Sequence, residues 1–136
     1  MHYKDCIMFQ MAKAYQRVHA EFKSGAAELG LTPIQCLVLQ AVFEEPGLSS
    51  GEIGQRLHID SATLSGILER LIERGWVVKN TSAKDRRVLE IHPTEQAMEQ
   101  KTALDGMVES LNEKVLASFR VEEKMLLRRM LEDLAQ

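Results

Sequence analysis

Residues 49–93 constrain the fold more than any other part of this chain of 136 residues. They contain two short helical patterns joined by a tight turn, followed by two short apolar runs with a polar connection between them. Ser49 and Glu52 have the spacing of a capping box, in which a hydroxyl and a carboxylate satisfy the free amides at a helix start. His58-Ile59-Asp60 then interrupts the helical period, and either Asp60 or the next residue can cap a second helix.

The second helix, predicted over residues 61–74, has the clearest pattern in the chain. Apolar residues recur on one face at helical spacing: Leu64, Ile67, Leu68, Leu71 and Ile72. The other face carries short side chains and one arginine: Ser61, Thr63, Ser65, Gly66 and Arg70. Short hydroxyl side chains allow close approach to a surface, and an arginine can bind a phosphate. Two helices joined by a turn, with the outer face of the second one free, predict a helix-turn-helix whose second helix enters the DNA major groove.

The two apolar runs, residues 76–79 and 87–91, are rich in β-branched side chains and predict a β-hairpin. The end of its polar connection gathers three cations around one carboxylate: Lys84, Asp85, Arg86 and Arg87. A cationic hairpin tip can place a guanidinium in a DNA minor groove, and a neighbouring aspartate can orient an arginine through paired hydrogen bonds. A helix-turn-helix followed by such a hairpin is a winged helix.

The segments on either side of this region are predicted to be helices that need partner surfaces. Near the N-terminus, apolar residues are spaced three and four apart: Met8, Met11, Tyr15, Val18 and Phe22. This apolar stripe is typical either of an ordinary buried helix face or of an interface with another chain. A capping box at Thr32 starts the next helix, and Thr94 caps a long helix that continues to about Phe119. The terminal segment, residues 125–134, is a short and strongly apolar helix, which suggests a symmetric dimer.

Charge and motif content narrow the possible functions. The net charge is −3, but residues 61–93 carry six basic and four acidic side chains, a local charge of +2, so the remainder carries −5. DNA binding needs a local basic patch and not a basic protein.

No apolar run approaches the roughly 18 residues of a membrane helix, and the start of the chain lacks the pattern of a signal peptide, so a cytoplasmic protein is expected. No nucleophile–base pair, phosphate loop or paired-carboxylate motif is present, so we expect neither an enzyme nor a cofactor.

The chain resembles the MarR (multiple antibiotic resistance regulator) family of winged-helix transcription factors. The matching pieces are Leu31-Thr32-Pro33-Ile34-Gln35, the helix 61–74 that ends in Glu-Arg-Gly-Trp, Asp85-Arg86-Arg87 and Pro93-Thr94-Glu95. Asp85 and Arg87 occupy the fixed positions of the family's D-x-R wing motif. Gly66 departs from the family, because many members carry a long polar or basic side chain there.

The resemblance implies a single domain over residues 1–136, mainly α-helical with a small β-hairpin. The winged-helix DNA-binding region would span residues 32–93, flanked by dimerisation helices within 1–30 and 95–136. It implies a homodimeric, ligand-responsive repressor that binds a pseudo-palindromic operator in double-stranded DNA. Seven of the eight predicted DNA-binding residues are expected to contact DNA: Ser61, Thr63 and Ser65 in the major groove, Arg87 in the minor groove, and Arg70, Lys84 and Arg86 at phosphates. The eighth, Asp85, is expected to orient Arg87.

The family also implies a pocket for a small aromatic or phenolic effector between the dimerisation helices and the winged helix. Tyr15, His19 and Cys36 could line it, although each could equally be a core or surface residue. Oxidant sensing by Cys6 or Cys36 is an alternative, as is a winged helix that binds proteins and not DNA. Metal binding is not expected, because the histidines and cysteines have no ligand spacing.

Overall fold

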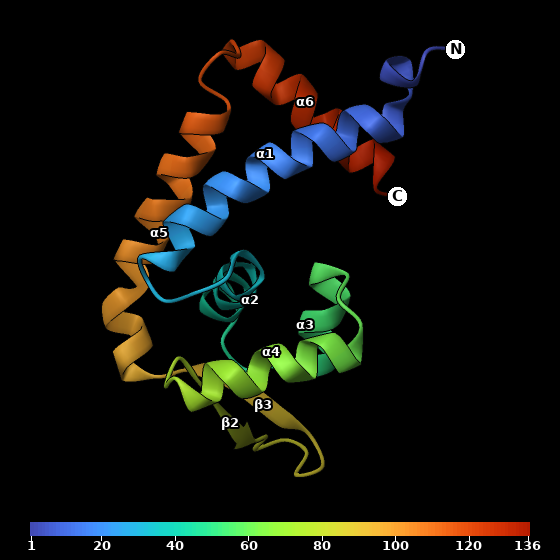
Figure 1. The fold of residues 1–136 in the computed structure, drawn as a ribbon. Coiled ribbons are helices and arrows are strands. Elements are labelled where there is room, and N and C mark those ends of the chain that lie inside the picture. The colour runs from blue at the N-terminus through green and yellow to red at the C-terminus, as the bar shows by residue number, and fades with distance from the viewer.

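The computed structural model describes all 136 residues and is mainly helical with a small antiparallel sheet, as predicted (Figure 1). After a short 3-10 turn at Tyr3–Asp5, the elements follow in the order α1 (Ile7–Ala27), α2 (Pro33–Glu44), β1 (Leu48–Ser49), α3 (Ser50–Leu57), α4 (Ser61–Glu73), β2 (Val77–Thr81), β3 (Leu89–Pro93), α5 (Glu95–Val115) and α6 (Val121–Leu134). No helix is both long enough and apolar enough to span a bilayer.

The sheet has the order β1-β3-β2, and α3 and α4 pack beside it to form a winged helix. Strand β1 was not predicted, because it consists of two residues that pair with β3 and carry no periodic signal. The hairpin strands begin one and two residues later than predicted. Strand β3 cannot begin at Arg87, because the amide of Arg87 is bound by the side chain of Asp85 within the turn.

The helix starts follow the predicted caps. Each capping box pairs a hydroxyl with the side chain three residues later: Thr32 with Gln35 and Ser49 with Glu52. Helix α5 ends at Val115, four residues before the predicted end, and a turn leads to Arg120, which caps α6. Here the helical pattern of apolar residues continues through the turn, so it did not mark the helix end.

The core occupies the winged helix and the places where α1 and α5 meet it. It is built mainly from leucine and valine side chains of α2, α4 and the sheet, closed by Ala26 of α1 and by Ala97 and Leu104 of α5. Gly25 lies inside α1 without ending it, and a Cβ atom there would lie 2.8 Å from Cδ1 of Leu111. The missing side chain of Gly25 therefore lets α1 and α5 approach closely.

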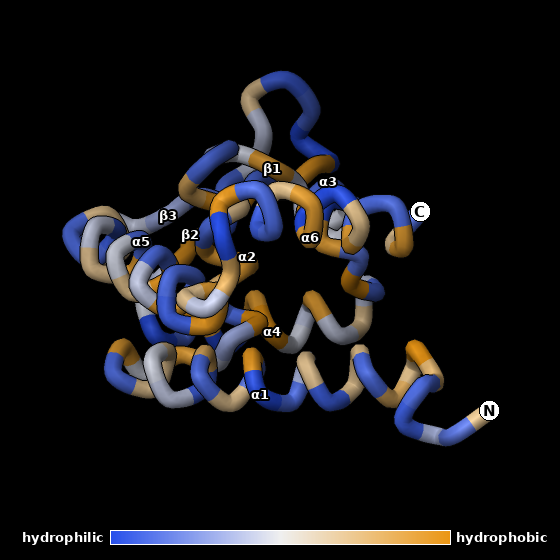
Figure 2. Tube along the Cα trace, turned by 90° about the horizontal axis from the view of Figure 1, so that it is seen from above, coloured by the Kyte–Doolittle hydropathy of each residue, from blue (hydrophilic) through white to orange (hydrophobic).

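The far end of the molecule leaves much apolar surface uncovered. Helix α6 has no buried residue, and the side chains of Met125 and Leu134 are 69% and 62% exposed. On α1, Met8 and Tyr15 are also largely exposed. Figure 2 shows α1 along one side of the molecule, with hydrophobic positions recurring among hydrophilic ones. Large unburied apolar patches of this kind mark interaction surfaces.

Candidate nucleic-acid interface

Helix α4 is held by one face and leaves the other free. Leu64, Leu68 and Leu71 are buried in the core, whereas the predicted DNA-facing residues are all exposed: Ser61, Thr63, Ser65, Gly66 and Arg70. A Cβ atom at Gly66 would meet no atom within 4 Å. Arg70 forms no ion pair with the acidic residues of its own helix. The outer face is thus open to a partner along its whole length.

The turn before α4 fixes its first residues. His58 ends α3 in the left-handed region, with φ 53°. The carboxylate of Asp60 accepts hydrogen bonds from the amide of Thr63 at 2.9 Å and from the Thr63 hydroxyl at 2.7 Å. These bonds hold the pKa of Asp60 below its ordinary value. Because the hydroxyl hydrogen of Thr63 is occupied, Thr63 can only accept a hydrogen bond from a base.

The wing turn is held by a serine that the sequence analysis did not single out. Ser82 is buried, and its Oγ accepts hydrogen bonds from the amides of Lys84 at 3.2 Å and Asp85 at 3.3 Å. The amide of Ser82 donates to the carbonyl oxygen of Val88 at 2.9 Å and closes the turn. A serine before a polar turn was the available signal, since serine side chains commonly bind turn amides.

Asp85 and Arg87 form the paired contact that the sequence suggested. Arg87 donates from Nε to Oδ1 at 3.1 Å and from Nη2 to Oδ2 at 3.2 Å. This contact lowers the pKa of the Asp85 carboxyl, which therefore stays ionised. The Arg87 side chain remains 90% exposed. The guanidinium is thus oriented without being buried, and it can reach a partner beyond the tip.

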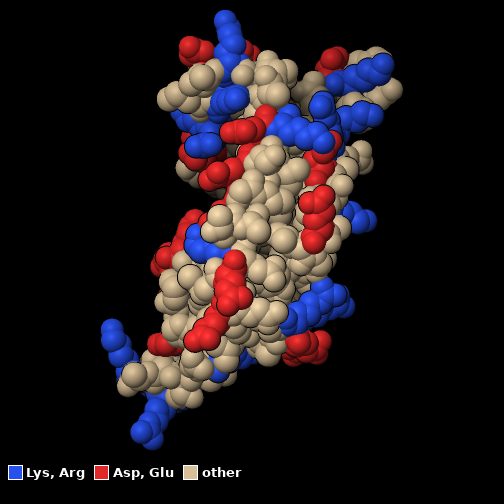
Figure 3. Space-filling model, turned by 90° about the vertical axis from the view of Figure 1, so that its left-hand side faces the viewer, with Lys and Arg blue, Asp and Glu red and all other residues tan.

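The remaining tip cations are free. Lys84 and Arg86 are exposed and take part in no ion pair. In Figure 3, Lys and Arg side chains project from the lower end of the molecule, where Figure 1 places the wing. Unpaired cations on a protruding tip are suited to phosphate contacts.

The base of the wing contains a second pair. Nε2 of His92 lies 3.0 Å from Oε2 of Glu90, two residues earlier on the same strand, β3. Hydrogen bonds from His92 and then from Ser82 lower the pKa of Glu90. The Glu90–His92 pair therefore lies at the base of the wing, on the strand that follows the wing turn.

Two of the three residues predicted for an effector pocket lie together. Tyr15 and His19 have ring centroids 5.5 Å apart and line a hollow of about 310 Å³ between α1 and the start of α2. Cys36 is not among its lining residues and lies in the core instead. Ile34 and Leu37 share the face of α2 that meets the hollow, whereas Cys36 points to the opposite side.

The two cysteines differ in environment. Burial raises the pKa of the Cys36 thiol to about 11, so this thiol stays protonated near neutral pH. Cys6 is only partly buried and precedes α1, and both thiols are free. No group of three or more metal-ligating side chains comes together in the chain.

Comparisons with known proteins agree with this arrangement. The sequence profile of the MarR family matches residues 29–88. The HTH-type transcriptional regulator SarZ of Staphylococcus aureus is 28% identical over 119 residues, which is 88% of this chain and 76% of SarZ.

Two solved structures share the whole fold. A probable transcriptional regulator from Pseudomonas aeruginosa superposes with a TM-score of 0.91 at 28% identity, covering 98% of this chain and 99% of that one. The transcriptional repressor CouR, solved bound to a 23-mer DNA duplex, has a TM-score of 0.89 at 25% identity and covers 98% and 94% of the two chains.

Proposed function

We propose that this chain is a homodimeric repressor that binds a pseudo-palindromic operator. The premise is that it belongs to the MarR family of winged-helix transcription regulators. The observation that carries the proposal is the free outer face of α4 beside a wing tip from which Arg87, held by Asp85, points outward. A repressor of this kind works in the cytoplasm and catalyses no reaction.

In the proposed complex, α4 lies in the major groove. Ser61, Thr63 and Ser65 reach base edges directly or through water, because their side chains are short. Thr63 accepts a hydrogen bond from a base amino group, since its own hydrogen is bound to Asp60. The open space at Gly66 lets the helix approach the base edges closely.

The wing supplies the second set of contacts. Arg87 enters the minor groove in the orientation that Asp85 gives it, where the narrow groove attracts a guanidinium. Lys84, Arg86 and Arg70 bind phosphates and fix the position of the protein on the duplex. The wing thereby contributes affinity at a site next to the one that α4 reads.

Dimerisation uses the apolar surface of α1, α5 and α6. Exposed methionine and leucine side chains of α6 have no partner within the chain and would be covered by a second copy. A symmetric dimer places two α4 helices about one DNA turn apart, so an inverted repeat is the expected operator.

Regulation is proposed to act through the hollow that Tyr15 and His19 line. It lies between α1, which belongs to the dimerisation part, and α2, which belongs to the winged helix. A small aromatic or phenolic effector there would change the distance between the two α4 helices of the dimer. If that distance no longer matches the spacing of the half-sites, one α4 helix loses its contacts and the protein binds DNA less tightly.

Two other functions remain as alternatives. Oxidant sensing would depend on Cys6, because the raised pKa of Cys36 disfavours its thiolate. A winged helix that binds proteins would tolerate loss of the wing cations and would show little dependence on salt.

The decisive experiment is selection from a random duplex DNA library, followed by titration of the enriched sequence at two salt concentrations. We expect an inverted repeat with half-sites about one turn apart, bound less tightly at higher salt. If no sequence is enriched, either with the free protein or after addition of phenolic compounds, the DNA-binding proposal is wrong.

A further inference from the structure

The outer face of α4 carries a threonine whose hydroxyl hydrogen is already bound. Thr63 is exposed, yet its Oγ1 donates to Oδ2 of Asp60 at 2.7 Å while its amide donates to Oδ1 at 2.9 Å. We propose that Asp60 is a positioning residue that determines base specificity without touching DNA: it leaves Thr63 an acceptor only, so each half-site requires adenine or cytosine where Thr63 faces it. This inference rests on the proposed DNA binding and adds to it the chemical class of one base.

The four bases fall into two classes in the major groove. Adenine and cytosine present an amino group, N6 or N4, where guanine and thymine present a carbonyl oxygen, O6 or O4. A hydroxyl oxygen without a free hydrogen can bind only the first class. Two acceptors that face each other in an interface without water are left unpaired, and this costs the full desolvation of both groups. Thr63 therefore separates the amino bases from the keto bases and does not separate adenine from cytosine.

The hydrogen stays on Asp60 because the competing bond is weaker. Hydrogen bonds from the amide and then from the hydroxyl of Thr63 lower the pKa of Asp60, so its carboxylate is ionised. A hydrogen bond to a charged acceptor is roughly twice as strong as one between neutral groups. Turning the Thr63 hydroxyl toward a base carbonyl would exchange the charged partner for a neutral one. A keto base is therefore rejected even though the hydroxyl can rotate.

The neighbours of Thr63 along α4 leave room for a base edge. Gly66 and Arg70 follow Thr63 by three and seven positions, so the three residues share one stripe of the helix. A Cβ atom at Gly66 would meet nothing within 4 Å. The position next to Thr63 in the stripe thus has no side chain that would keep a base away from the short threonine.

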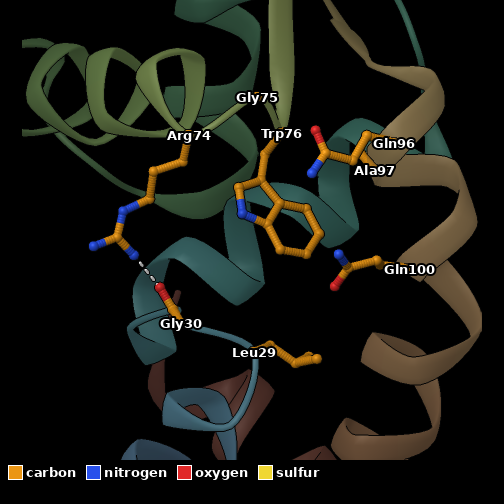
Figure 4. A pocket seen from close by; sticks show the side chains of 8 residues that line it. All are labelled: Leu29, Gly30, Arg74, Gly75, Trp76, Gln96, Ala97 and Gln100. Atoms are coloured by element: carbon orange, nitrogen blue, oxygen red, sulfur yellow. Dashed lines mark hydrogen bonds between the residues drawn. The ribbon is translucent and has the colours of Figure 1, made fainter.

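Both ends of α4 are fixed, and a hydrogen bond selects between bases only when its protein atom is held in place. The Asp60 cap holds the first turn. At the other end, Figure 4 shows the guanidinium of Arg74 reaching the carbonyl oxygen of Gly30, to which its Nη1 donates a hydrogen bond. The hydroxyl of Thr94 donates to the carbonyl oxygen of Gly75, just beyond the helix. These contacts keep Thr63 at a constant place on the reading face.

Asp60→Asn tests the proposal by reversing the polarity of the bond. The amide of Thr63 can only donate, so it keeps the side-chain oxygen as its acceptor, and the new NH₂ group takes the place of Oδ2 and donates to the Thr63 hydroxyl. The hydroxyl hydrogen is then free for a base carbonyl. Asparagine and aspartate are about equally good N-caps, so the helix is retained. We expect the preferred bases at this position to change from adenine or cytosine to guanine or thymine.

The unchanged protein, Asp60→Asn and Thr63→Val are each used to select from a random duplex library. The enriched operator is then titrated with all four base pairs at every half-site position, changed in both half-sites together. In the unchanged protein, one position should favour adenine or cytosine by about tenfold per half-site. Asp60→Asn should invert this ratio, and Thr63→Val should remove it. The ratios at all other positions should stay the same.

Ratios between bases are compared because Asp60→Asn also removes a negative charge, which should raise the affinity for every sequence. Two matched controls change the same residue types on other elements. Asp5→Asn in the N-terminal turn and Thr102→Val on α5 alter exposed residues, and both should leave every ratio unchanged.

A measurement on the protein without DNA tests the contact itself. In Thr63→Val the amide still donates to Asp60 but the hydroxyl is gone, so the pKa of Asp60 should rise part of the way to its ordinary value. Carbon-13 NMR of the Asp60 carboxyl during a pH titration follows this change. Thr63→Ser keeps the hydroxyl and should retain both the low pKa and the base preference.

The outcomes separate this inference from the proposed function. An operator whose base ratios are the same in the unchanged protein, Asp60→Asn and Thr63→Val would overturn the inference and leave DNA binding intact. A preference of the unchanged protein for guanine or thymine at the position that Thr63→Val alters would do the same, because the hydroxyl would then donate. An Asp60 pKa that Thr63→Val leaves unchanged would show that the contact is absent in solution. If no operator is enriched although the NMR titration confirms the contact, DNA binding is wrong and the inference falls with it.

Discussion

At the scale of single residues, the contacts of the wing orient the Arg87 side chain and contribute little to the stability of the fold. Exposed ion pairs such as Asp85–Arg87 contribute little to the free energy of unfolding. Their geometry matters instead, because Ser82 holds the turn and Asp85 holds the guanidinium. A side chain oriented before binding loses less conformational entropy when it enters a groove.

The first prediction concerns this orientation. Arg87→Ala should weaken specific DNA binding by about 1–3 kcal/mol, because its contacts in the groove are lost. Asp85→Asn should give a smaller loss, since Arg87 stays present but loses the charged partner that orients it. Both are measured by equilibrium titration with the selected operator.

Lys23→Ala, an exposed lysine on α1 that makes no ion pair, is the matched control and should change little. An Arg87→Ala protein with unchanged affinity would remove the wing from the mechanism.

The second prediction follows from the raised pKa of Cys36. With a pKa of about 11, only about one thiol in a thousand is ionised at pH 8, so iodoacetamide should modify Cys36 far more slowly than Cys6 in the folded protein. The rate at Cys36 should rise with pH up to about 11 and should increase sharply in denaturant. Mass spectrometry of peptides after timed alkylation measures both rates. Fast modification of Cys36 at neutral pH would contradict this prediction and would support oxidant sensing by Cys36.

How far the sequence predicted the site depended on the distance between partners along the chain. Asp85 and Arg87 are two residues apart, so their pairing could be expected from the motif alone. The position of Cys36 depended on which face of α2 meets the core, and a helix that is apolar on most sides does not reveal this. The hydrogen bonds of Ser82 likewise became evident only once the turn was described.

At the scale of elements, the helix starts were predictable because a cap is a contact between residues three apart. Contacts between distant segments were not. The hydroxyl of Thr94 caps α5 through the amide of Ala97 at 3.0 Å and also donates to the carbonyl oxygen of Gly75 at 2.5 Å. The second bond joins the end of α4 to the start of α5 across 19 positions, and no sequence pattern indicates it.

The third prediction tests the hydrogen bond between Thr94 and Gly75. Thr94→Ala should lower the free energy of unfolding by about 1–2 kcal/mol, because it removes the cap and leaves the Gly75 carbonyl without its donor. Thr94→Ser retains the hydroxyl and should recover most of the loss. Urea denaturation at a fixed protein concentration measures both, since a dimer's stability depends on concentration. Equal losses in the two variants would show that the methyl group, and not the hydroxyl, matters.

The fourth prediction concerns α6. Truncation before Met125 should abolish the dimer, because the apolar face of the last helix is removed. Leu134→Glu tests the same surface without deleting an element, and it should cost the single chain little because Leu134 is already 62% exposed. Light scattering gives the mass of each species, and Gln55→Glu on α3 controls for the added charge. A stable dimer of the truncated chain would contradict the proposed interface.

At the scale of the whole molecule, the chain separates two kinds of surface. Apolar side chains without partners gather on α1 and α6, whereas unpaired cations gather at the opposite end on the wing (Figures 1 and 3). The net charge of −3 does not reveal the basic wing. In the sequence, only the count of charged residues over 61–93 indicated it. The winged helix could be predicted because its pattern is local, whereas a dimer remains a proposal that rests on the apolar surface left uncovered.

The last prediction follows from this division. Because the basic patch carries a local charge of only +2, affinity should come from two copies acting on one DNA, and it should fall steeply as salt rises. The logarithm of the binding constant falls by about 0.9 per phosphate contact for each unit of log salt. Lys84→Ala and Arg86→Ala should each reduce that slope by about one per protomer, while leaving the preferred sequence unchanged. Arg87→Ala should instead relax the preference at the positions beside the half-site. Titrations over a range of salt concentrations separate the two classes, and a slope that none of these substitutions changes would place the phosphate contacts elsewhere on the protein.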